Sequence, residues 1–176
     1  MTKFRLLLLL AVLLLLSSLA TGCQTGRRNL AADQSVVCNL GVEPPRLNSA
    51  ATAETVAWDI IRHTLEGLVS RDNNDRIVAG MAESWDISDD GLVYTFYLRD
   101  AQWSNGTAVA AADFVFALKT VLNPDAPSPY AHYADPVRNA REFRSGTAAA
   151  GDLGIEAIDE KTLKITLEQA TGYFLD

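Results

Sequence analysis

Hydrophobic residues are spaced unevenly along this chain, and their periodicity predicts a mixture of helices and strands. Residues 6–16 form one unbroken apolar run, whereas the apolar segments after it are short and separated by Gly, Pro, Asn and Asp. Some of these segments alternate every second residue, as strands do, and others recur at helical spacing. Because the helical segments do not alternate regularly with the strands, the pattern predicts an α+β fold rather than repeated βαβ units.

Two apolar segments near the start predict a strand and then a helix. Residues 36–40 form a short apolar run that ends at Gly41, which is typical of a buried strand. Further on, four large apolar residues recur at steps of 3, 4 and 3 and predict one face of an amphipathic helix: Trp58, Ile61, Leu65 and Leu68. Thr52 is a candidate N-cap for this helix.

Two hairpins and a second helix are predicted further along. The first hairpin pairs residues 84–88 with 92–98 around the Gly-containing turn at 89–91, and the alternation places Tyr94, Phe96 and Leu98 on one face. The second hairpin pairs residues 155–158 with 162–167. Between the hairpins, residues 110–122 have a helical apolar face, and residues 125–151 predict turns and short helices.

The first 22 residues have the features of an export signal. Lys3 and Arg5 precede the apolar run of 6–16, which is too short to span a bilayer as a helix, and small polar residues follow it. The string Leu19-Ala20-Thr21-Gly22-Cys23 resembles the lipobox of bacterial lipoproteins. The resemblance implies that Cys23 is acylated and that residues 23–35 form a flexible tether. The alternative is an ordinary secretory signal followed by an incidental cysteine.

Composition and charge exclude several classes of function. The net charge of −7 does not suit binding to nucleic acid, which needs clustered Lys and Arg. Cys38 is expected to be a buried core residue without a disulfide partner, and the two histidines lie far from it, so we expect no metal site and no cofactor. No sequence motif of a catalytic nucleophile, metalloprotease or phosphate-binding loop is present, so we do not expect an enzyme.

One acidic segment partly imitates a calcium-binding loop. Asp86, Ser88 and Asp90 alternate before Gly91, as the first ligands of such a loop do. The twelfth position, which supplies a bidentate Glu in these loops, is Tyr97. An acidic hairpin turn is therefore the preferred interpretation.

Seven short strings in a fixed order carry a more specific resemblance. They are Leu65-Glu66-Gly67-Leu68-Val69, Gly80-Met81-Ala82-Glu83-Ser84-Trp85, residues 90–99, Trp103-Ser104-Asn105-Gly106-Thr107, Ala112-Asp113-Phe114-Val115, Ser128-Pro129-Tyr130-Ala131 and Leu153-Gly154-Ile155-Glu156-Ala157. Together they resemble the oligopeptide- and dipeptide-binding proteins of bacterial ABC importers, solute-binding protein family 5.

This resemblance implies part of a two-lobed fold of the periplasmic-binding-protein type (type II-like), truncated before the second lobe. By analogy, residues 36–65 begin the first lobe and residues 66–176 form an α+β subdomain peculiar to the family. Because the opposite wall of the cleft would be missing, we expect a truncated product or partial record that does not bind ligand by itself.

The resemblance also implies which residues line the ligand. Ala53, Glu54 and Thr55 align with a main-chain segment that pairs with the peptide backbone as an added strand does. That role conflicts with a helix start at Thr52 and moves the expected start toward Val56. Tyr130 aligns with a tyrosine at the border of the cleft, and its alternative is an ordinary packed aromatic residue in a turn.

The function implied is that of a monomeric, lipid-anchored substrate-binding component of an ABC importer. It would stand in the periplasm or on the outer face of a bacterial membrane, capture peptides and deliver them to permease and ATPase subunits. Other ligands known in the family, namely nickel, haem and sugars, stay open. Two alternatives from other classes are an envelope lipoprotein hydrolase and a purely structural lipoprotein.

Overall fold

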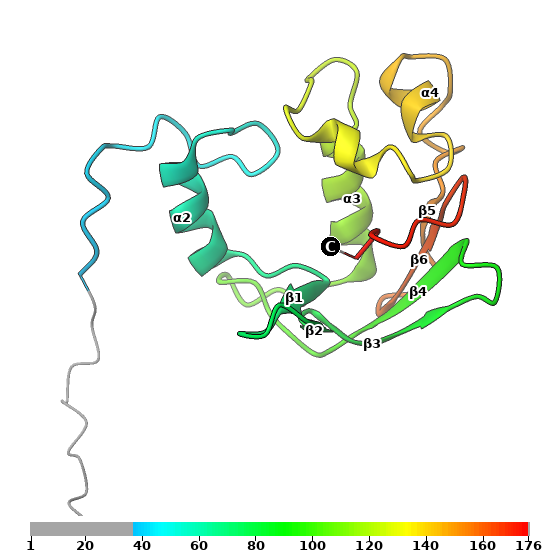
Figure 1. The fold of residues 1–176 in the computed structure, drawn as a ribbon, viewed down its shortest axis with the longest axis horizontal. Coiled ribbons are helices and arrows are strands. Elements are labelled where there is room, and N and C mark those ends of the chain that lie inside the picture. The colour runs from blue at the N-terminus through cyan, green and yellow to red at the C-terminus, as the bar shows by residue number, and fades with distance from the viewer. Residues whose placement is uncertain (1–36, 176) are drawn as a thin grey trace, which may run out of the picture. The chain divides into compact units, whose positions relative to one another are not determined.

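The computed structural model describes residues 37–175, and the chain divides into two compact units at Asn39 and Leu40. The predicted export signal, Cys23 and the tether at 23–35 therefore lie outside the described residues. The described part of the first unit is the short stretch 37–39, and every helix and strand that the structure describes belongs to the second unit (Figure 1).

The second unit is an α+β structure, as the hydrophobic pattern predicted. Its elements are α2 (Thr55–Thr64), β1 (Val69–Arg71), β2 (Ile77–Ala79), β3 (Ala82–Ile87), β4 (Val93–Leu98), α3 (Ala111–Val121), the 3-10 helix η1 (Ala131–Ala134), α4 (Ala140–Arg144), β5 (Ile155–Ala157) and β6 (Thr162–Thr166). Strands β1 and β2 form a two-stranded sheet, and the other four form a sheet of order β3-β4-β6-β5. All pairings are antiparallel.

The two predicted hairpins together make up the four-stranded sheet. β3 pairs with β4, and β5 pairs with β6, each around a short turn. At the first turn Gly91 has a φ of +68°, a left-handed conformation that side chains disfavour. Ser88 Oγ and the Leu92 N–H donate hydrogen bonds to the Asp90 carboxylate, so this carboxylate closes the turn. The acidic segment is thus a hairpin turn, and the described residues contain no group of three metal-ligating side chains.

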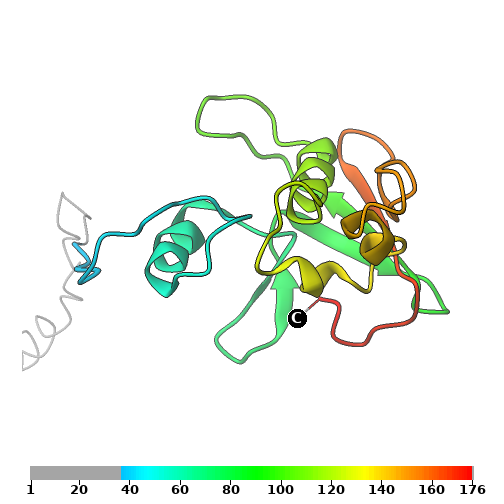
Figure 2. The same ribbon diagram turned by 90° about the horizontal axis from the view of Figure 1, so that it is seen from above.

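The hydrophobic core lies between the four-stranded sheet and α3. Tyr94, Phe96 and Leu98, which were predicted to share one face of β4, are all buried, and α3 contacts β5 and β6 (Figure 2). The aliphatic residues of the partner strand face the same core, since Tyr94 stands opposite Ile165 and Phe96 opposite Leu163. Burial of one large apolar side chain contributes about 1.5–3 kcal/mol to folding.

The predicted start of the second helix is held by one carboxylate. Asp113, in the first turn of α3, accepts hydrogen bonds from the Ala110 N–H and the Trp103 Nε1–H, both at 3.0 Å. Ala110 has no side chain that could cap the helix, so the carboxylate reaches back to it. The same carboxylate fixes the loop that carries Trp103 and Gly106 against the helix.

The strand predicted at 36–40 is wrong for every residue that the structure describes. Residues 37–40 have no regular secondary structure, and Val37 is 96% exposed. Cys38, expected to be buried, is exposed. An apolar run becomes a buried strand only when a neighbouring strand pairs with it, and none of the described strands does so.

The first helix was predicted too long at its C-terminal end. Ile61 is buried as predicted and Trp58 is partly buried, but α2 ends at Thr64 and Leu65 is extended. Long-range pairing overrides the helical spacing, because the main-chain carbonyl groups of Gly67 and Leu68 accept hydrogen bonds from the N–H groups of residues 81 and 82. The segment after α2 is therefore attached to the start of β3 instead of continuing the helix.

Candidate functional site

The segment just before α2 presents an extended, exposed main chain. Glu54, the N-cap residue, has φ −80° and ψ 130°, and Ala53, Glu54 and Thr55 are all exposed. A turn in which the N–H groups of Ala51 and Thr52 donate to the Asn48 carbonyl precedes this segment. The helix begins at Thr55, close to the start expected from the resemblance rather than at Thr52. Exposed extended main chain is the shape that strand-like pairing with a ligand requires.

Thr52 does not cap the helix as predicted. It is fully buried, and its hydroxyl donates to Glu54 Oε2 at 2.5 Å. The Ala53 N–H donates to the same oxygen at 3.2 Å. The hydrogen bond from the Thr52 hydroxyl, followed by the main chain of Glu54 itself and that of Ala53, stabilises the ionised carboxylate and lowers the pKa of Glu54.

Tyr130, which is distant in sequence, contacts the same segment. It lies at the start of η1, and its hydroxyl donates to the Ala53 carbonyl at 3.5 Å, across 77 positions of sequence. Its ring meets Trp58 of α2 edge-on, with ring centroids 5.9 Å apart and planes at 64°. The structure therefore brings together Tyr130 and the segment Ala53–Thr55, the two stretches selected from the sequence.

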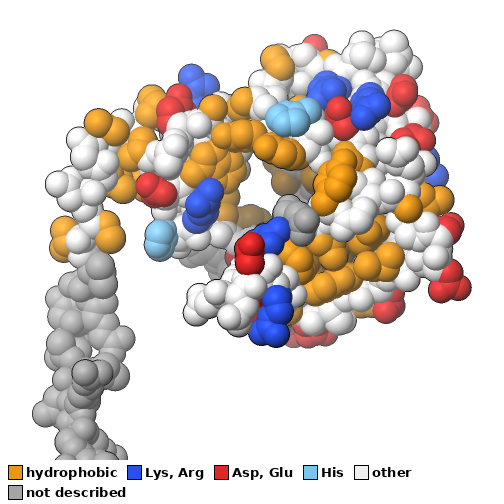
Figure 3. All heavy atoms as spheres, viewed as in Figure 1, with side chains coloured by type: hydrophobic (Ala, Val, Ile, Leu, Met, Phe, Trp, Pro, Cys, Tyr) orange, Lys and Arg blue, Asp and Glu red, His pale blue; other side chains and the backbone are white. Residues whose placement is uncertain are grey.

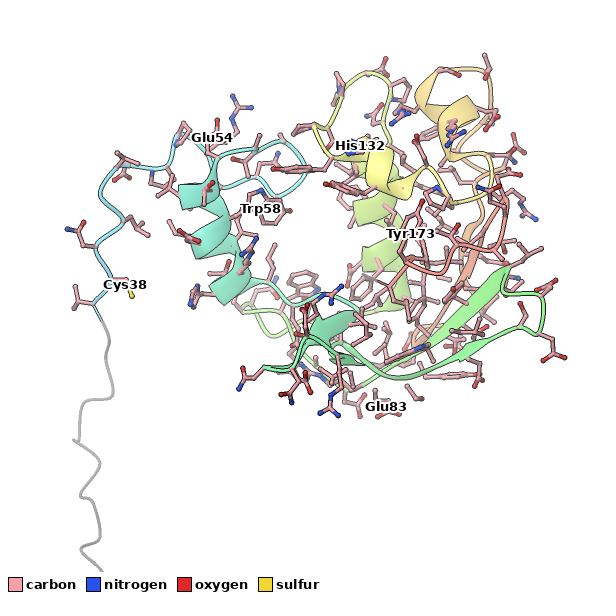
Figure 4. All side chains as sticks on the ribbon, in the orientation of Figure 1. Cys38, Glu54, Trp58, Glu83, His132 and Tyr173 are labelled. Carbon is pink, nitrogen blue, oxygen red and sulfur yellow. The ribbon has the colours of Figure 1, made fainter. Side chains whose placement is uncertain are left out.

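Trp58 is a neighbour of the site that the sequence did not assign to it. In Figure 4 its side chain projects from α2 on the side of the helix that faces η1, where Tyr130 meets it. The sequence showed only that Trp58 belongs to the apolar helix face. Its position one helical turn after Glu54 was the one available signal, because a side chain there points back toward the start of the helix.

An apolar cavity of about 330 Å³ continues from Tyr130 into the unit. Its walls include Val69 of β1, Leu118 of α3, Tyr133 and Phe174, and none of its lining residues is charged. Figure 3 shows hydrophobic side chains gathered on this face beside a hollow. The environment suits apolar groups, since a charged group entering it would lose its hydration without gaining a partner.

A second cavity is lined in part by polar side chains that already bond to protein partners. The second cavity, of about 460 Å³, contains Arg99, but Arg99 is already paired with Glu66 at 2.5 Å and donates to the Gly80 carbonyl at 3.1 Å. Trp103 and Asp113, which also line it, bond to each other. Within residues 37–175, no helix has the length and apolar character needed to cross a bilayer.

Comparison with known proteins places this architecture among extracellular binding proteins. The family described as bacterial extracellular solute-binding proteins, family 5 Middle, matches residues 76–176. The chain belongs to this family of solute-binding proteins.

Peptide-binding proteins are prominent among the relatives. The chain is 38% identical to the periplasmic oligopeptide-binding protein OppA of Escherichia coli (strain K12) over 148 residues, 82% of this chain and 27% of that protein. It is 33% identical over 152 residues to the oligopeptide-binding protein OppA of Bacillus subtilis (strain 168), 86% of this chain and 28% of the relative. A probable deoxycholate-binding periplasmic protein of Escherichia coli is 35% identical.

Solved structures of the family share the fold of the second unit. The substrate-binding domain of an oligopeptide ABC transporter from Bacillus anthracis is 41% identical, with a TM-score of 0.70 over 72% of this chain and 24% of that one. OppA of Haemophilus influenzae in complex with RPPGFSPFR is 35% identical, with a TM-score of 0.74 over 78% of this chain and 27% of that chain. The chain thus spans about a quarter of its relatives and corresponds to one section of their fold.

Proposed function

We propose that this chain supplies one wall of the ligand cleft of a peptide-binding protein that serves an ABC importer. The observation that carries the proposal is the hydrogen bond between Tyr130 and the Ala53 carbonyl, which joins the two stretches that the family resemblance assigns to the ligand. The exposed main chain of Ala53–Thr55 would pair with the peptide backbone, and Tyr130 would border the cleft. The protein performs no chemistry and passes its peptide to permease and ATPase subunits.

Main-chain recognition supports peptides as the ligand class. Every peptide offers the same N–H and C=O groups, so a site built from Ala53–Thr55 accepts many sequences. The cavity beside Tyr130 has no charged lining residue and is suited to apolar side chains. Several relatives are named for oligopeptides, which agrees with this ligand class.

The proposal requires a second wall, because residues 24–176 by themselves would leave the other side of a bound peptide in water. A suitable test protein is therefore a hybrid in which residues 37–175 of this chain replace the matching segment of the Escherichia coli relative. We expect this hybrid to bind tri- to pentapeptides with micromolar affinity in calorimetric titration and to release them unchanged, as judged by mass spectrometry. Cleavage of the peptides would favour a hydrolase instead, and absence of binding by a folded hybrid would contradict the proposal.

The second part of the proposal is that the mature protein is a monomer held at the membrane by acylated Cys23. The support is the lipobox-like string 19–23 after an apolar run too short to span a bilayer. One acyl chain binds a membrane reversibly, whereas two or more chains give stable anchoring. The anchor would keep the binding protein beside its permease.

The substitution Cys23→Ala is expected to abolish membrane attachment. Acylation needs the thiol, so the variant should take up no labelled fatty acid and should move from the detergent phase to the aqueous phase on phase partitioning. Cys38→Ala is the matched control, since it removes the other cysteine and should leave labelling unchanged. Label in the Cys23→Ala variant would rule out this lipidation site.

A further inference from the structure

Both main-chain polar groups of Ala53 already have hydrogen-bond partners within the protein. Its N–H donates to Glu54 Oε2 at 3.2 Å, and its carbonyl accepts from the Tyr130 hydroxyl at 3.5 Å. A strand pairing with this residue needs one or both of these groups. Binding therefore begins with an exchange of hydrogen bonds within the protein.

The donors around Glu54 form a ready-made site for one acceptor oxygen. The buried Thr52 hydroxyl and the Ala53 N–H both point at Oε2, from 2.5 Å and 3.2 Å. A carbonyl oxygen of a peptide main chain has the same acceptor chemistry and could take this position. The carboxylate of Glu54 thus stands where a ligand oxygen would be held.

The side chain of Glu54 does not cap the helix. Glu54 occupies the N-cap position of α2, where Asp, Asn, Ser or Thr usually accepts from a free N–H of the first turn. Its side chain makes no such bond and instead turns back to Thr52 and Ala53. Because the residue is exposed, the carboxylate can swing into water without burying its charge.

We propose that Glu54 is a tethered plug: its carboxylate occupies the acceptor position beside Thr52 and Ala53 until a peptide carbonyl displaces it. This inference rests on the proposed function. It assigns Glu54 a competing role, whereas the family resemblance assigns only its main chain to the ligand. The plug keeps the buried Thr52 hydroxyl hydrogen-bonded in the absence of ligand, and it lowers affinity because every peptide must first displace it.

The test compares peptide affinities of the two-lobed hybrid with trialanine, a peptide without charged side chains. Glu54→Ala removes the plug together with its two hydrogen bonds and should tighten the dissociation constant about three- to tenfold, the range that corresponds to about one net protein hydrogen bond because water competes for both donors. Glu54→Gln keeps an acceptor of the same shape but without charge, so its gain should be smaller. Asp59→Ala, an exposed acidic residue of α2 outside the site, controls for the loss of one negative charge and should change affinity by less than twofold.

Amide hydrogen exchange gives a second readout that needs no ligand. In the two-lobed hybrid without peptide, the Ala53 amide should exchange faster in Glu54→Ala than in the parent, while exchange in β4 and β6 stays the same. Equal or weaker trialanine binding by a folded Glu54→Ala hybrid would overturn the plug while leaving the proposed function intact. Loss of binding in the parent hybrid itself would overturn the proposed function, and the plug with it.

Discussion

Replacement of Phe96 by alanine is expected to destabilise the second unit by about 3–5 kcal/mol. Phe96 lies in the middle of β4, is only 1% exposed, and stands opposite Leu163 of β6. Its ring also stacks near Tyr94, with centroids 6.4 Å apart. Removal of the ring leaves a cavity beside the sheet. The folded state then loses the free energy of burying the ring and the van der Waals contacts that the ring made. Against a typical total stability of about 5–15 kcal/mol, this loss leaves little margin.

Phe116→Ala is the matched control for this prediction. Phe116 lies on α3 and is 73% exposed, so the same change of side chain should alter the unfolding free energy by less than about 0.5 kcal/mol. Urea unfolding followed by circular dichroism measures both variants. Similar losses in the two would show that the core is not where the structure places it.

Residues 24–176 alone are expected to give no measurable binding heat with tri- to pentapeptides at millimolar concentration, whereas the two-lobed hybrid should bind in the micromolar range. This difference in peptide affinity, at least about a thousandfold, follows from the number of cleft walls that enclose the ligand. A cleft buries most of its ligand only when it encloses it from both sides. With a single wall, each hydrogen bond from Ala53–Thr55 contributes about 0.5–1.5 kcal/mol, because water competes for the same groups.

Such contributions are smaller than the several kcal/mol that association costs in lost freedom of motion. Calorimetry on the two proteins with the same peptide pool makes the comparison direct. Micromolar binding by residues 24–176 would show that the whole site lies within this section of the fold, and that a second lobe is not needed for capture.

The sequence predicted the sheet well because its signals are local. Alternation with period 2 in β4 and β6, together with turn residues such as Gly91, determines which side chains face the core. Helix α3 was predicted for a similar reason, since its apolar residues recur at helical spacing and end just before Asn123 and Pro124. Both hairpins connect strands that are neighbours in sequence, so no long-range contact had to be known.

The errors arose where long-range contacts decide the local structure. Residues 37–40 have the composition of a strand but no paired neighbour among the described strands. Leu65 continues a helical spacing, yet the main chain beyond it hydrogen-bonds to the start of β3. Periodicity records which residues are apolar, whereas pairing depends on which segments meet in the folded chain.

The candidate site was found only in part from the sequence. The family resemblance selected Ala53, Glu54, Thr55 and Tyr130, and the structure adds the hydrogen bond between the two stretches and the packing of Trp58. The bond between the Thr52 hydroxyl and the Glu54 carboxylate could not be read from composition or spacing, because Thr52 looked like an ordinary helix cap. Side-chain rotamers and burial decide such bonds.

We propose that Ala53–Thr55 and Tyr130 form one wall of a peptide cleft. The most direct measurement is a crystal structure of the two-lobed hybrid with bound trialanine. We expect peptide main-chain N–H and C=O groups within hydrogen-bonding distance of the main chain of Ala53–Thr55, with Tyr130 beside the peptide. A peptide bound in the cleft but away from all four of these residues would contradict it.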